Sequence, residues 1–366
     1  MAGSTFGNIF KITTWGESHG KGVGVVVDGC PAGLSLCEED IQKFLNRRKP
    51  GQSKFTTPRK EDDSVEILSG VFEGKTTGTP ISLVVYNKNQ QSKDYSEIAS
   101  YYRPGHADYT FDMKYGFRDY RGGGRSSGRE TIGRVAAGAI AVKILDQLGI
   151  KLMTYSRSIG PIACDPRYFD AEEILKNPVY MPDADAAENA MAYLEACIAE
   201  QNSSGGVVEC IISGVPAGIG DPVFEKLNAN LAKAVMSIGA VKGFEIGDGF
   251  DVAKATGKNN NDAFRIEADG SVSKETNHAG GILGGMSDGS AIILRATIKP
   301  TPSISATQHT VSKSGEEIDI NIKGRHDPII VPRAVVVVES MAAITIVDAM
   351  FANMSARMDS LERFYK

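Results

Sequence analysis

Two patterns of hydrophobic residues alternate along the chain. Residues 23–27 form a short, mostly β-branched run that ends at Asp28-Gly29, which is typical of a buried strand. Between residues 131 and 148, apolar side chains recur at spacings of three and four, as on the buried face of a helix. Residues 184–200, 222–238 and 334–358 are also expected to be helical, although the last begins with the strand-like run 335–338. Strands and helices are therefore expected to be interleaved along the chain, with long polar loops between them.

Turn and cap residues predict where two further elements begin and end. Ser35 lies three residues before Glu38, which is the spacing of a capping box, so we expect a helix that runs to about Arg48 before Pro50-Gly51. Residues 70–87 are expected to form a hairpin that turns near residues 78–80 and returns along residues 81–86.

One pattern occurs twice in the chain. The strand at residues 23–27 is followed by Pro31-Ala32-Gly33 and a predicted helix, and residues 210–213 are followed by Pro216-Ala217-Gly218 and another predicted helix. Pro-Ala-Gly is a common turn, so the repetition has a plain explanation. It also fits two duplicated halves folded about a pseudo-two-fold axis, which would make residues 1–366 a single domain. The sequence leaves both explanations open.

Composition narrows the classes of function. The chain of 366 residues has a formal net charge of −5, which argues against a general binder of nucleic acid or of anionic membranes. The first ten residues lack the pattern of a signal peptide, and no stretch approaches the ~18 uninterrupted apolar residues of a transmembrane helix. Five cysteines without a CxxC pair indicate reduced thiols. We therefore expect a cytoplasmic protein.

The densest chemical signal is the loop of residues 121–129, Arg-Gly-Gly-Gly-Arg-Ser-Ser-Gly-Arg, directly before the predicted helix at residue 131. Glycines free backbone N–H groups to face an anion, and a helix N-terminus adds partial positive charge. Arginine and serine side chains add donors suited to phosphate. Such runs also occur in disordered linkers, but a linker does not usually precede a strongly amphipathic helix. The loop is expected to hold a phosphorylated ligand.

Three of the five histidines, His19, His106 and His326, lie among glycine, proline, arginine and carboxylate residues. Most histidines are structural or solvated, but irregular polar loops often carry function, and histidine suits general acid catalysis near pH 7. No pair has metal-ligand spacing, so no metal site is expected. The glycine motifs at residues 70–76 and 20–24 lack the spacing of a P-loop or the helix that follows a dinucleotide fingerprint.

With these residues together, the chain resembles the chorismate synthase family over essentially its whole length. The segments that carry the resemblance are residues 16–20, Arg47-Arg48, 103–108, 119–127, 243–247, 277–285, 299–301 and 325–328. The resemblance implies an α+β fold, a β-α-β sandwich with internal pseudo-two-fold symmetry, assembled as a homotetramer. The implied reaction is a 1,4-trans elimination of phosphate from 5-enolpyruvylshikimate 3-phosphate to give chorismate, which requires reduced FMN although there is no net redox change.

The resemblance also implies roles for single residues. His19 would protonate the departing phosphate, His106 would protonate or stabilise the reduced flavin near N1, and Asp327 would accept from the flavin N5–H. The FMN contacts would be Arg125, Ser126, Ser127, Gly239, Ala240, Gly284, Lys299, Pro300, Thr301, Pro302, Ser303 and Arg325. The cations that would bind the substrate are Arg47, Arg48, Lys54, Arg103, Arg129 and Arg134.

Other functions fit these residues less well. An NAD(P)H-dependent FMN oxidoreductase would need a nicotinamide site, and no dinucleotide fingerprint is present. Fungal-type members of the family reduce their own flavin, but a chain of this length without an obvious insertion favours supply of reduced FMN by an external flavin reductase. A flavin or phosphate sensor is disfavoured because a binding module has little use for two titrating acids.

Overall fold

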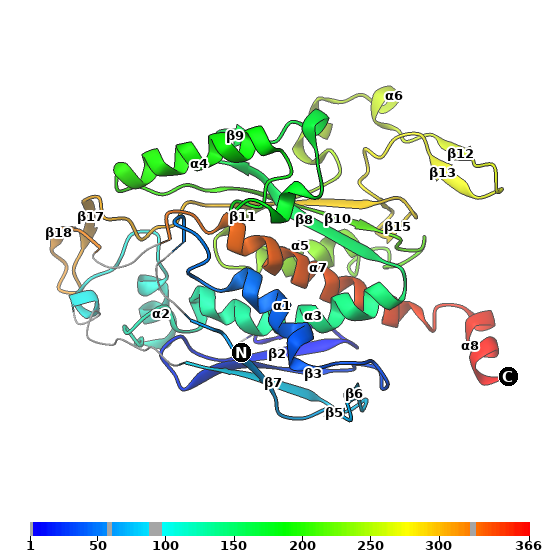
Figure 1. Ribbon diagram of the computed structural model, residues 1–366, viewed down its shortest axis with the longest axis horizontal. Helices are drawn as coiled ribbons and strands as arrows, with labels where there is room; N and C mark the ends of the chain where they lie inside the picture. Colours follow the sequence, from blue (N-terminus) through cyan, green and yellow to red (C-terminus); the bar gives the residue numbers. More distant parts are fainter. Residues whose placement is uncertain (1–2, 57–60, 88–96, 323–326) are drawn as a thin grey trace.

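Two antiparallel sheets enclose a layer of helices (Figure 1). The computed structural model describes residues 3–56, 61–87, 97–322 and 327–366. The first sheet has the order β1 (Thr5–Phe6), β2 (Lys11–Gly16), β3 (Gly22–Asp28), β7 (Ile81–Tyr86) and β4 (Val65–Ile67). The second has the order β11 (Val241–Ile246), β16 (Ile292–Ile298), β10 (Gly206–Ser213), β8 (Lys151–Ile159) and β9 (Ile162–Ala163). This arrangement confirms the predicted β-α-β sandwich.

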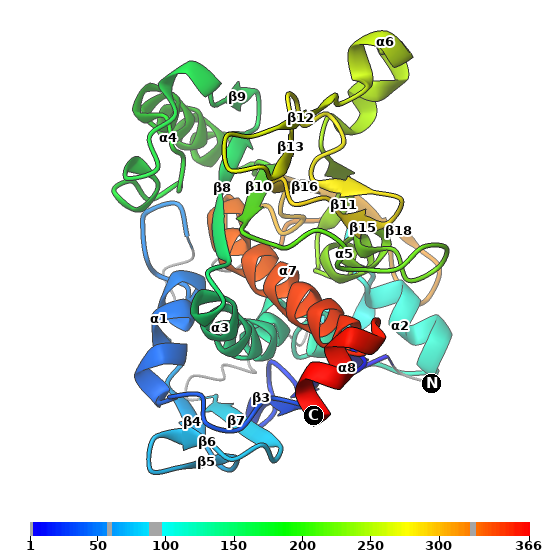
Figure 2. The same ribbon diagram turned by 90° about the vertical axis from the view of Figure 1, so that its right-hand side faces the viewer.

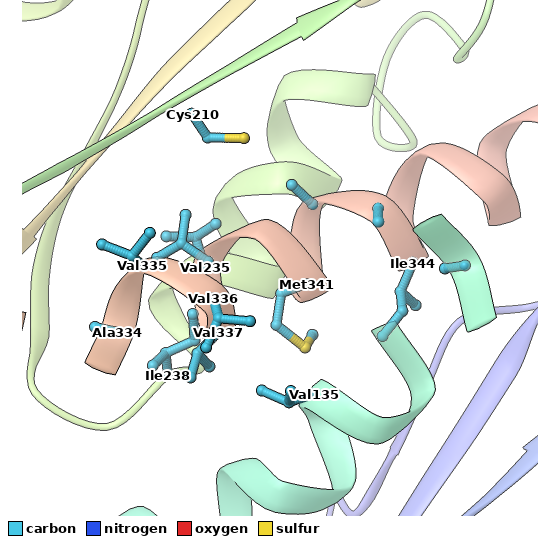
Figure 3. Packing of buried hydrophobic residues seen from close by; sticks show 14 of the residues in the cluster. Val135, Cys210, Val235, Ile238, Ala334, Val335, Val336, Val337, Met341 and Ile344 are labelled. Atoms are coloured by element: carbon cyan, nitrogen blue, oxygen red, sulfur yellow. The ribbon is translucent and has the colours of Figure 1, made fainter. Parts of the chain in front are cut away.

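The helical layer consists of α1 (Glu38–Arg48), α3 (Thr131–Gln147), α5 (Leu227–Met236) and α7 (Val331–Asn353), which lie between the sheets in Figure 2. Val135 of α3, Val235 of α5 and Met341 of α7 meet in the hydrophobic core (Figure 3). By length and composition α7 could cross a membrane, but 78% of its most apolar window is buried inside the fold. It is therefore the central core helix of the sandwich.

The remaining elements are short or peripheral. They are α2 (Asp108–Tyr115), α4 (Ala184–Ala199), α6 (Gly257–Asn260), α8 (Met358–Tyr365) and the hairpins β5 (Val71–Phe72) with β6 (Lys75–Thr76), β12 (Phe264–Ile266) with β13 (Val272–Lys274), β14 (Ile282–Leu283) with β15 (Met286–Ser287), and β17 (Gln308–Val311) with β18 (Glu317–Ile320). Helix α4 lies on the outer side of the second sheet, as Figures 1 and 2 both show.

The two halves of the chain have the same topology. The first half runs β2, β3, α1, β4, β7, α3, and the second runs β8, β10, α5, β11, β16, α7. In both sheets the fourth of these strands lies between the second and the third. Of the two explanations for the repeated Pro-Ala-Gly pattern, the duplicated half is therefore the correct one.

The repeated turns also share their hydrogen bonds. Thr76 Oγ1 donates to the carbonyl of Pro31 at 2.6 Å, and Ser287 Oγ donates to the carbonyl of Pro216 at 2.5 Å. Each hydroxyl also accepts from the backbone amide that follows its turn. Thr76 accepts from Leu34 at 3.0 Å, and Ser287 accepts from Ile219 at 2.9 Å. Each half thus anchors its Pro-Ala-Gly turn to a short hairpin through one hydroxyl group.

Two predicted boundaries were wrong. Ser35 is not a helix cap, because it forms a β-bridge with Lys75. Helix α1 instead begins at Glu38, where the Asp40 carboxylate accepts from the amide of Cys37 at 3.1 Å. Helix α5 is shorter than the predicted 222–238, because Val223 has a φ of 69°, which a helix cannot contain.

The predicted hairpin at residues 70–87 was wrong in its turn and its pairing, whereas the strand predicted at residues 81–86 is confirmed as β7. The chain turns earlier, at Glu73-Gly74, where both residues have positive φ as a tight two-residue hairpin requires. Strand β7 then joins the main sheet between β3 and β4. Residues 335–338 are helical despite their β-branched side chains, because α7 is enclosed on all sides and tertiary packing overrides local preference.

Candidate active site

A large cavity of about 2020 Å³ opens where the two halves meet. The N-terminal ends of α3 and α7 both line it, as do the C-terminal ends of α1 and α5. Among the described residues, ten lysines and arginines and six aspartates and glutamates line its wall. An excess of four positive charges, together with two helix N-termini, makes the cavity attractive to anions although the whole chain is acidic.

The arginine- and glycine-rich loop of residues 121–129 lies in this wall and leads directly into α3. It folds into two short 3₁₀ turns, Gly124–Ser126 and Gly128–Glu130. Ser126 Oγ donates to the carbonyl of Gly123 at 2.7 Å, and Ser127 Oγ accepts from the amide of Arg129 at 3.3 Å. The loop therefore has a defined conformation, which the linker alternative would not give.

Arg125 anchors this loop to the first sheet. Its guanidinium donates to the carbonyl of Gly16 at 3.0 Å and to Thr14 Oγ1 at 2.7 Å. Thr14 in turn donates to Glu130 Oε1 at 2.8 Å, and Glu130 also pairs with Arg134 at 2.7 Å. Glu130, which no local sequence pattern distinguishes, thus connects β2 with the first turn of α3.

His19 lies in the cavity wall on a tight turn after β2. The amide of Gly20 donates to the carbonyl of Glu17 at 3.1 Å, and Ser18 Oγ lies 3.2 Å from His19 Nδ1. The loop of residues 121–129 approaches the ring closely, because a Cβ placed on Gly122 would lie only 2.5 Å from His19 Nδ1. Only glycine allows this approach.

His106 is held on both sides. Its Nδ1 lies 2.9 Å from the carbonyl of Pro104, which can only accept, so Nδ1 carries a hydrogen. In the neutral ring Nε2 then accepts from Ser303 Oγ at 2.8 Å. Burial and the neighbouring Arg103 lower the pKa of His106 to about 4. The ring is therefore neutral at pH 7.

Two cations flank His106. Arg103 makes a bidentate pair with Asp108, with both distances 2.8 Å, and Lys299 Nζ donates to the carbonyl of Gly105 at 2.7 Å. Partial burial, with a smaller contribution from a neighbouring lysine, lowers the pKa of Lys299. An anion bound beside His106 would meet both positive charges.

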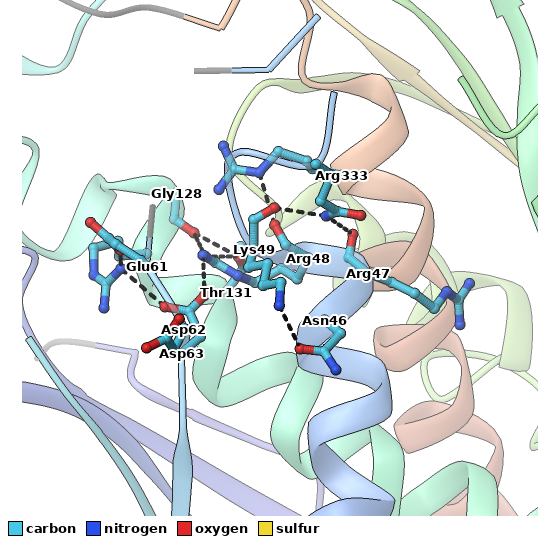
Figure 4. Close-up of polar contacts among 12 residues, drawn as sticks. Asn46, Arg47, Arg48, Lys49, Glu61, Asp62, Asp63, Gly128, Thr131 and Arg333 are labelled. Carbon is cyan, nitrogen blue, oxygen red and sulfur yellow. Dashed lines mark hydrogen bonds and ion pairs between the residues drawn. The ribbon is translucent and has the colours of Figure 1, made fainter. Parts of the chain in front are cut away.

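Arg48 is buried at the base of the cavity (Figure 4). Its guanidinium pairs with Asp63 at 2.8 Å and donates to the carbonyl of Gly128 at 3.0 Å. Asp63 also pairs with Arg129 at 3.2 Å, and Arg129 contacts Glu61 as well. Burial lowers the pKa of Arg48 to about 10, against the opposing effect of Asp63. Arg48 remains charged at neutral pH and supports the loop of residues 121–129 from below.

Asp327 is held by an arginine that sequence reasoning missed. Arg333, in the first turn of α7, pairs with Asp327 at 2.7 Å. Its Nε donates to the carbonyl of Arg48 at 2.8 Å (Figure 4). Arg333 thus links the proposed flavin-facing carboxylate to the C-terminal end of α1.

Most of the predicted site residues line this one cavity. They are His19, Arg48, Arg103, His106, Arg125, Ser126, Ser127, Arg129, Arg134, Gly239, Ala240, Lys299, Thr301, Pro302, Ser303 and Asp327. Ala240 has a φ of 73°, a strained conformation for a residue other than glycine, and its carbonyl accepts from the amide of Lys299 at 3.0 Å. Thr301 Oγ1 is buried without a hydrogen-bond partner among the described residues.

Four predicted residues do not line the cavity. Arg47 pairs with Glu339 at 2.7 Å, and Lys54 pairs with Glu195 on the surface. Gly284 lies in the turn between β14 and β15, and Pro300 follows β16 outside the cavity wall. Arg325 and His326 fall outside the described residues.

Comparisons with known proteins agree on one family. The family model described as chorismate synthase matches residues 10–351. Chorismate synthase of Agathobacter rectalis is 78% identical over 366 residues, and that of Lachnospira eligens is 69% identical over 366 residues, with each alignment covering all of both chains. A crystal structure of chorismate synthase, 31% identical, superposes with a TM-score of 0.74 and covers 96% of this chain and 95% of its own.

Proposed function

The chain belongs to the chorismate synthase family, and from that premise we propose that the cavity between its two halves is where the reaction takes place. The enzyme is a chorismate synthase, a lyase that eliminates phosphate from 5-enolpyruvylshikimate 3-phosphate to give chorismate. The observation that carries the location is the convergence of His19, His106, seven arginines and two helix N-termini on one cavity among the described residues.

The residues of the cavity fit the reduced FMN that the family uses. A volume of about 2020 Å³ is more than twice that of a typical single-ligand pocket, so there is room for a flavin beside the substrate. The Thr301 hydroxyl, which has no hydrogen-bond partner among the described residues, and the Lys299 ammonium would suit a flavin phosphate. Further contacts would come from Arg125, Ser126, Ser127, Gly239, Ala240, Pro302 and Ser303. When bound, reduced FMN supplies electron density to the reacting allylic system and accepts the ring proton.

His19 would act as the general acid for the departing phosphate. The ring stands on a short turn and is packed against Gly122, so its orientation is restricted. A proton placed on the leaving oxygen lowers the barrier to C–O cleavage, and such acid catalysis typically contributes about 10²–10⁴-fold in rate. Arg129 would bind the same phosphate from the neighbouring loop.

His106 and Asp327 would act on the flavin side. Because His106 is neutral in the ligand-free enzyme, its Nε2 can accept a proton when an anionic ligand binds and raises the pKa of the ring. The ring would then stabilise negative charge near flavin N1. The Asp327 carboxylate, held by Arg333, would accept from flavin N5–H and orient it for proton transfer.

Four cations that line the cavity, Arg48, Arg103, Arg129 and Arg134, would hold the carboxylates and phosphate of the substrate. All four already bond to carboxylates of the protein: Arg48 and Arg129 to Asp63, Arg103 to Asp108, and Arg134 to Glu130. Arg47 and Lys54 lie outside the cavity wall, so they would not contact the substrate directly.

Anaerobic phosphate release with dithionite-reduced FMN tests the function. We expect phosphate and chorismate in equal amounts, and no release would overturn the whole proposal. His19→Ala and His106→Ala should each reduce turnover by at least about 10²-fold with FMN and substrate still bound. Near-normal turnover in both variants would refute the acid assignments while leaving the reaction intact.

We further propose that the enzyme is a cytoplasmic homotetramer that receives reduced FMN from an external flavin reductase. Anaerobic incubation with NADPH, oxidised FMN and substrate distinguishes this from a bifunctional enzyme that reduces its own flavin. Chorismate formed without another reductant would favour the bifunctional kind. Sedimentation velocity tests the oligomeric state, and a single monomeric species would contradict the tetramer.

A further inference from the structure

One carboxamide joins the turn that carries His19 to Arg129. Asn87, directly after β7, donates from Nδ2 to the carbonyls of Glu17 at 3.0 Å and Gly20 at 2.9 Å. Its Oδ1 accepts from Arg129 Nε at 2.9 Å. The two carbonyls lie at the two ends of the His19 turn, so Asn87 bonds that turn on both sides of the histidine.

The chemistry of these contacts requires an amide. The two backbone carbonyls can only accept, and the guanidinium N–H of Arg129 can only donate. An asparagine side chain has two donors and an acceptor at the required spacing, whereas aspartate would set a carboxylate oxygen against two carbonyl oxygens. The backbone N–H of Asn87 also donates to the carbonyl of Lys21 at 3.0 Å, which fixes the backbone from which the side chain extends.

We propose that Asn87 is a positioning residue for the elimination, because it sets the His19 ring relative to Arg129. This inference rests on the proposed function, in which His19 protonates the phosphate that Arg129 binds. A proton donor and a binding cation that address one phosphate must keep a fixed separation. A displacement of about 1 Å in such a pair can cost about 10²-fold in rate.

Substitution of Asn87 tests this directly. Asn87→Ala and Asn87→Asp should each lower kcat by about 10²-fold, with the Kd for oxidised FMN unchanged within about twofold. Asn177→Asp is the matched control, because Asn177 also donates to two backbone carbonyls, of Glu173 at 2.9 Å and Met181 at 2.8 Å, but outside the cavity wall. Asn177→Asp should keep normal kcat, with a loss of thermal stability similar to that of the Asn87 variants. Ordinary kcat in both Asn87 variants would overturn the inference.

A double-mutant cycle on kcat shows whether Asn87 acts through His19. If it does, Asn87→Ala should change kcat by less than about threefold in a His19→Ala background, because residues that act as a unit are not additive. A full 10²-fold loss in that background would mean that Asn87 acts elsewhere, and the inference would be wrong.

NMR spectra of the five histidine rings, recorded without ligands, test the position of His19 independently of turnover. The His19 Cε1–H resonance, assigned by its loss in His19→Ala, should shift in Asn87→Ala, whereas that of the exposed His309 should not. If His19→Ala keeps turnover, the acid role fails, and a shifted His19 signal still supports positioning of the ring. An unshifted His19 signal would overturn the inference whatever the kinetics show.

Discussion

Replacement of Asp63 by asparagine should destabilise the enzyme by about 3 kcal/mol. Removal of one partner from a buried ion pair typically costs about 3–5 kcal/mol, because the remaining charge stays buried. The side chains of Arg48 and Asp63 are 1% and 0% exposed and are joined at 2.8 Å. Asparagine keeps the shape of aspartate and tolerates the left-handed backbone at this position, where φ is 47°. The change therefore removes mainly the charge. The expected cost lies near the lower limit of the range of about 3–5 kcal/mol.

Calorimetry and urea unfolding at pH 7 measure this loss, with reversibility checked by a second scan. Glu195→Gln is the control, because the Lys54–Glu195 pair is 66% and 55% exposed and should contribute at most about 1 kcal/mol. The double variant Arg48→Met/Asp63→Asn removes both charges, keeps a residue that tolerates the left-handed backbone at position 63, and should recover part of the stability. A loss below about 1 kcal/mol in Asp63→Asn, or an equal loss in the control, would refute the reasoning from burial.

Three other residues of the cavity give further tests. Gly122→Ala should remove most turnover while the circular dichroism spectrum is kept, because its Cβ would lie 2.5 Å from His19 Nδ1; normal turnover would contradict the close approach. By NMR, the His106 ring should titrate near pH 4 in the absence of ligands, and a midpoint at 6.5 or higher would be inconsistent with its burial. Because this folded pKa lies below the ordinary value of 6.5, the contribution of His106 to stability is full above pH 6.5 and is lost as the pH falls towards 4. Thr301→Val should weaken FMN binding about tenfold, the loss of one hydrogen bond, with an unchanged Tm, since the hydroxyl has no partner among the described residues; unchanged FMN affinity would remove Thr301 from the flavin contacts.

The elements that could be predicted from sequence are those in which local pattern and tertiary packing agree. Helix α3 has small and apolar residues at helical spacing, and β3 is a β-branched run that ends in a turn. Where the two disagreed, packing decided the outcome. Residues 335–338 favour a strand by local preference, yet they form the first turns of the buried helix α7.

The residues of the site also fall into two groups, those that a local sequence pattern indicates and those that it does not. The loop of residues 121–129 could be found because it concentrates arginine, serine and glycine within nine residues. Asn87, Glu130 and Arg333 could not, because their importance lies in contacts across the fold. Asn87 is 42 residues from Arg129 in the chain, and Arg333 is 285 residues from the carbonyl that it contacts. No local pattern distinguishes such residues from others of their type.

The internal symmetry explains why the cavity lies where it does. In the pseudo-two-fold relation α1 corresponds to α5, and α3 corresponds to α7. Arg333, in the first turn of α7, donates to the carbonyl of Arg48 at the end of α1, and Arg134, in the first turn of α3, donates to the carbonyl of Ser237 after α5 at 3.3 Å. Each half thus uses an arginine from one helix N-terminus to cap the C-terminus of a helix in the other half. Because these crossed contacts bring both helix N-termini to one place, the positive field of the cavity follows from the duplication itself.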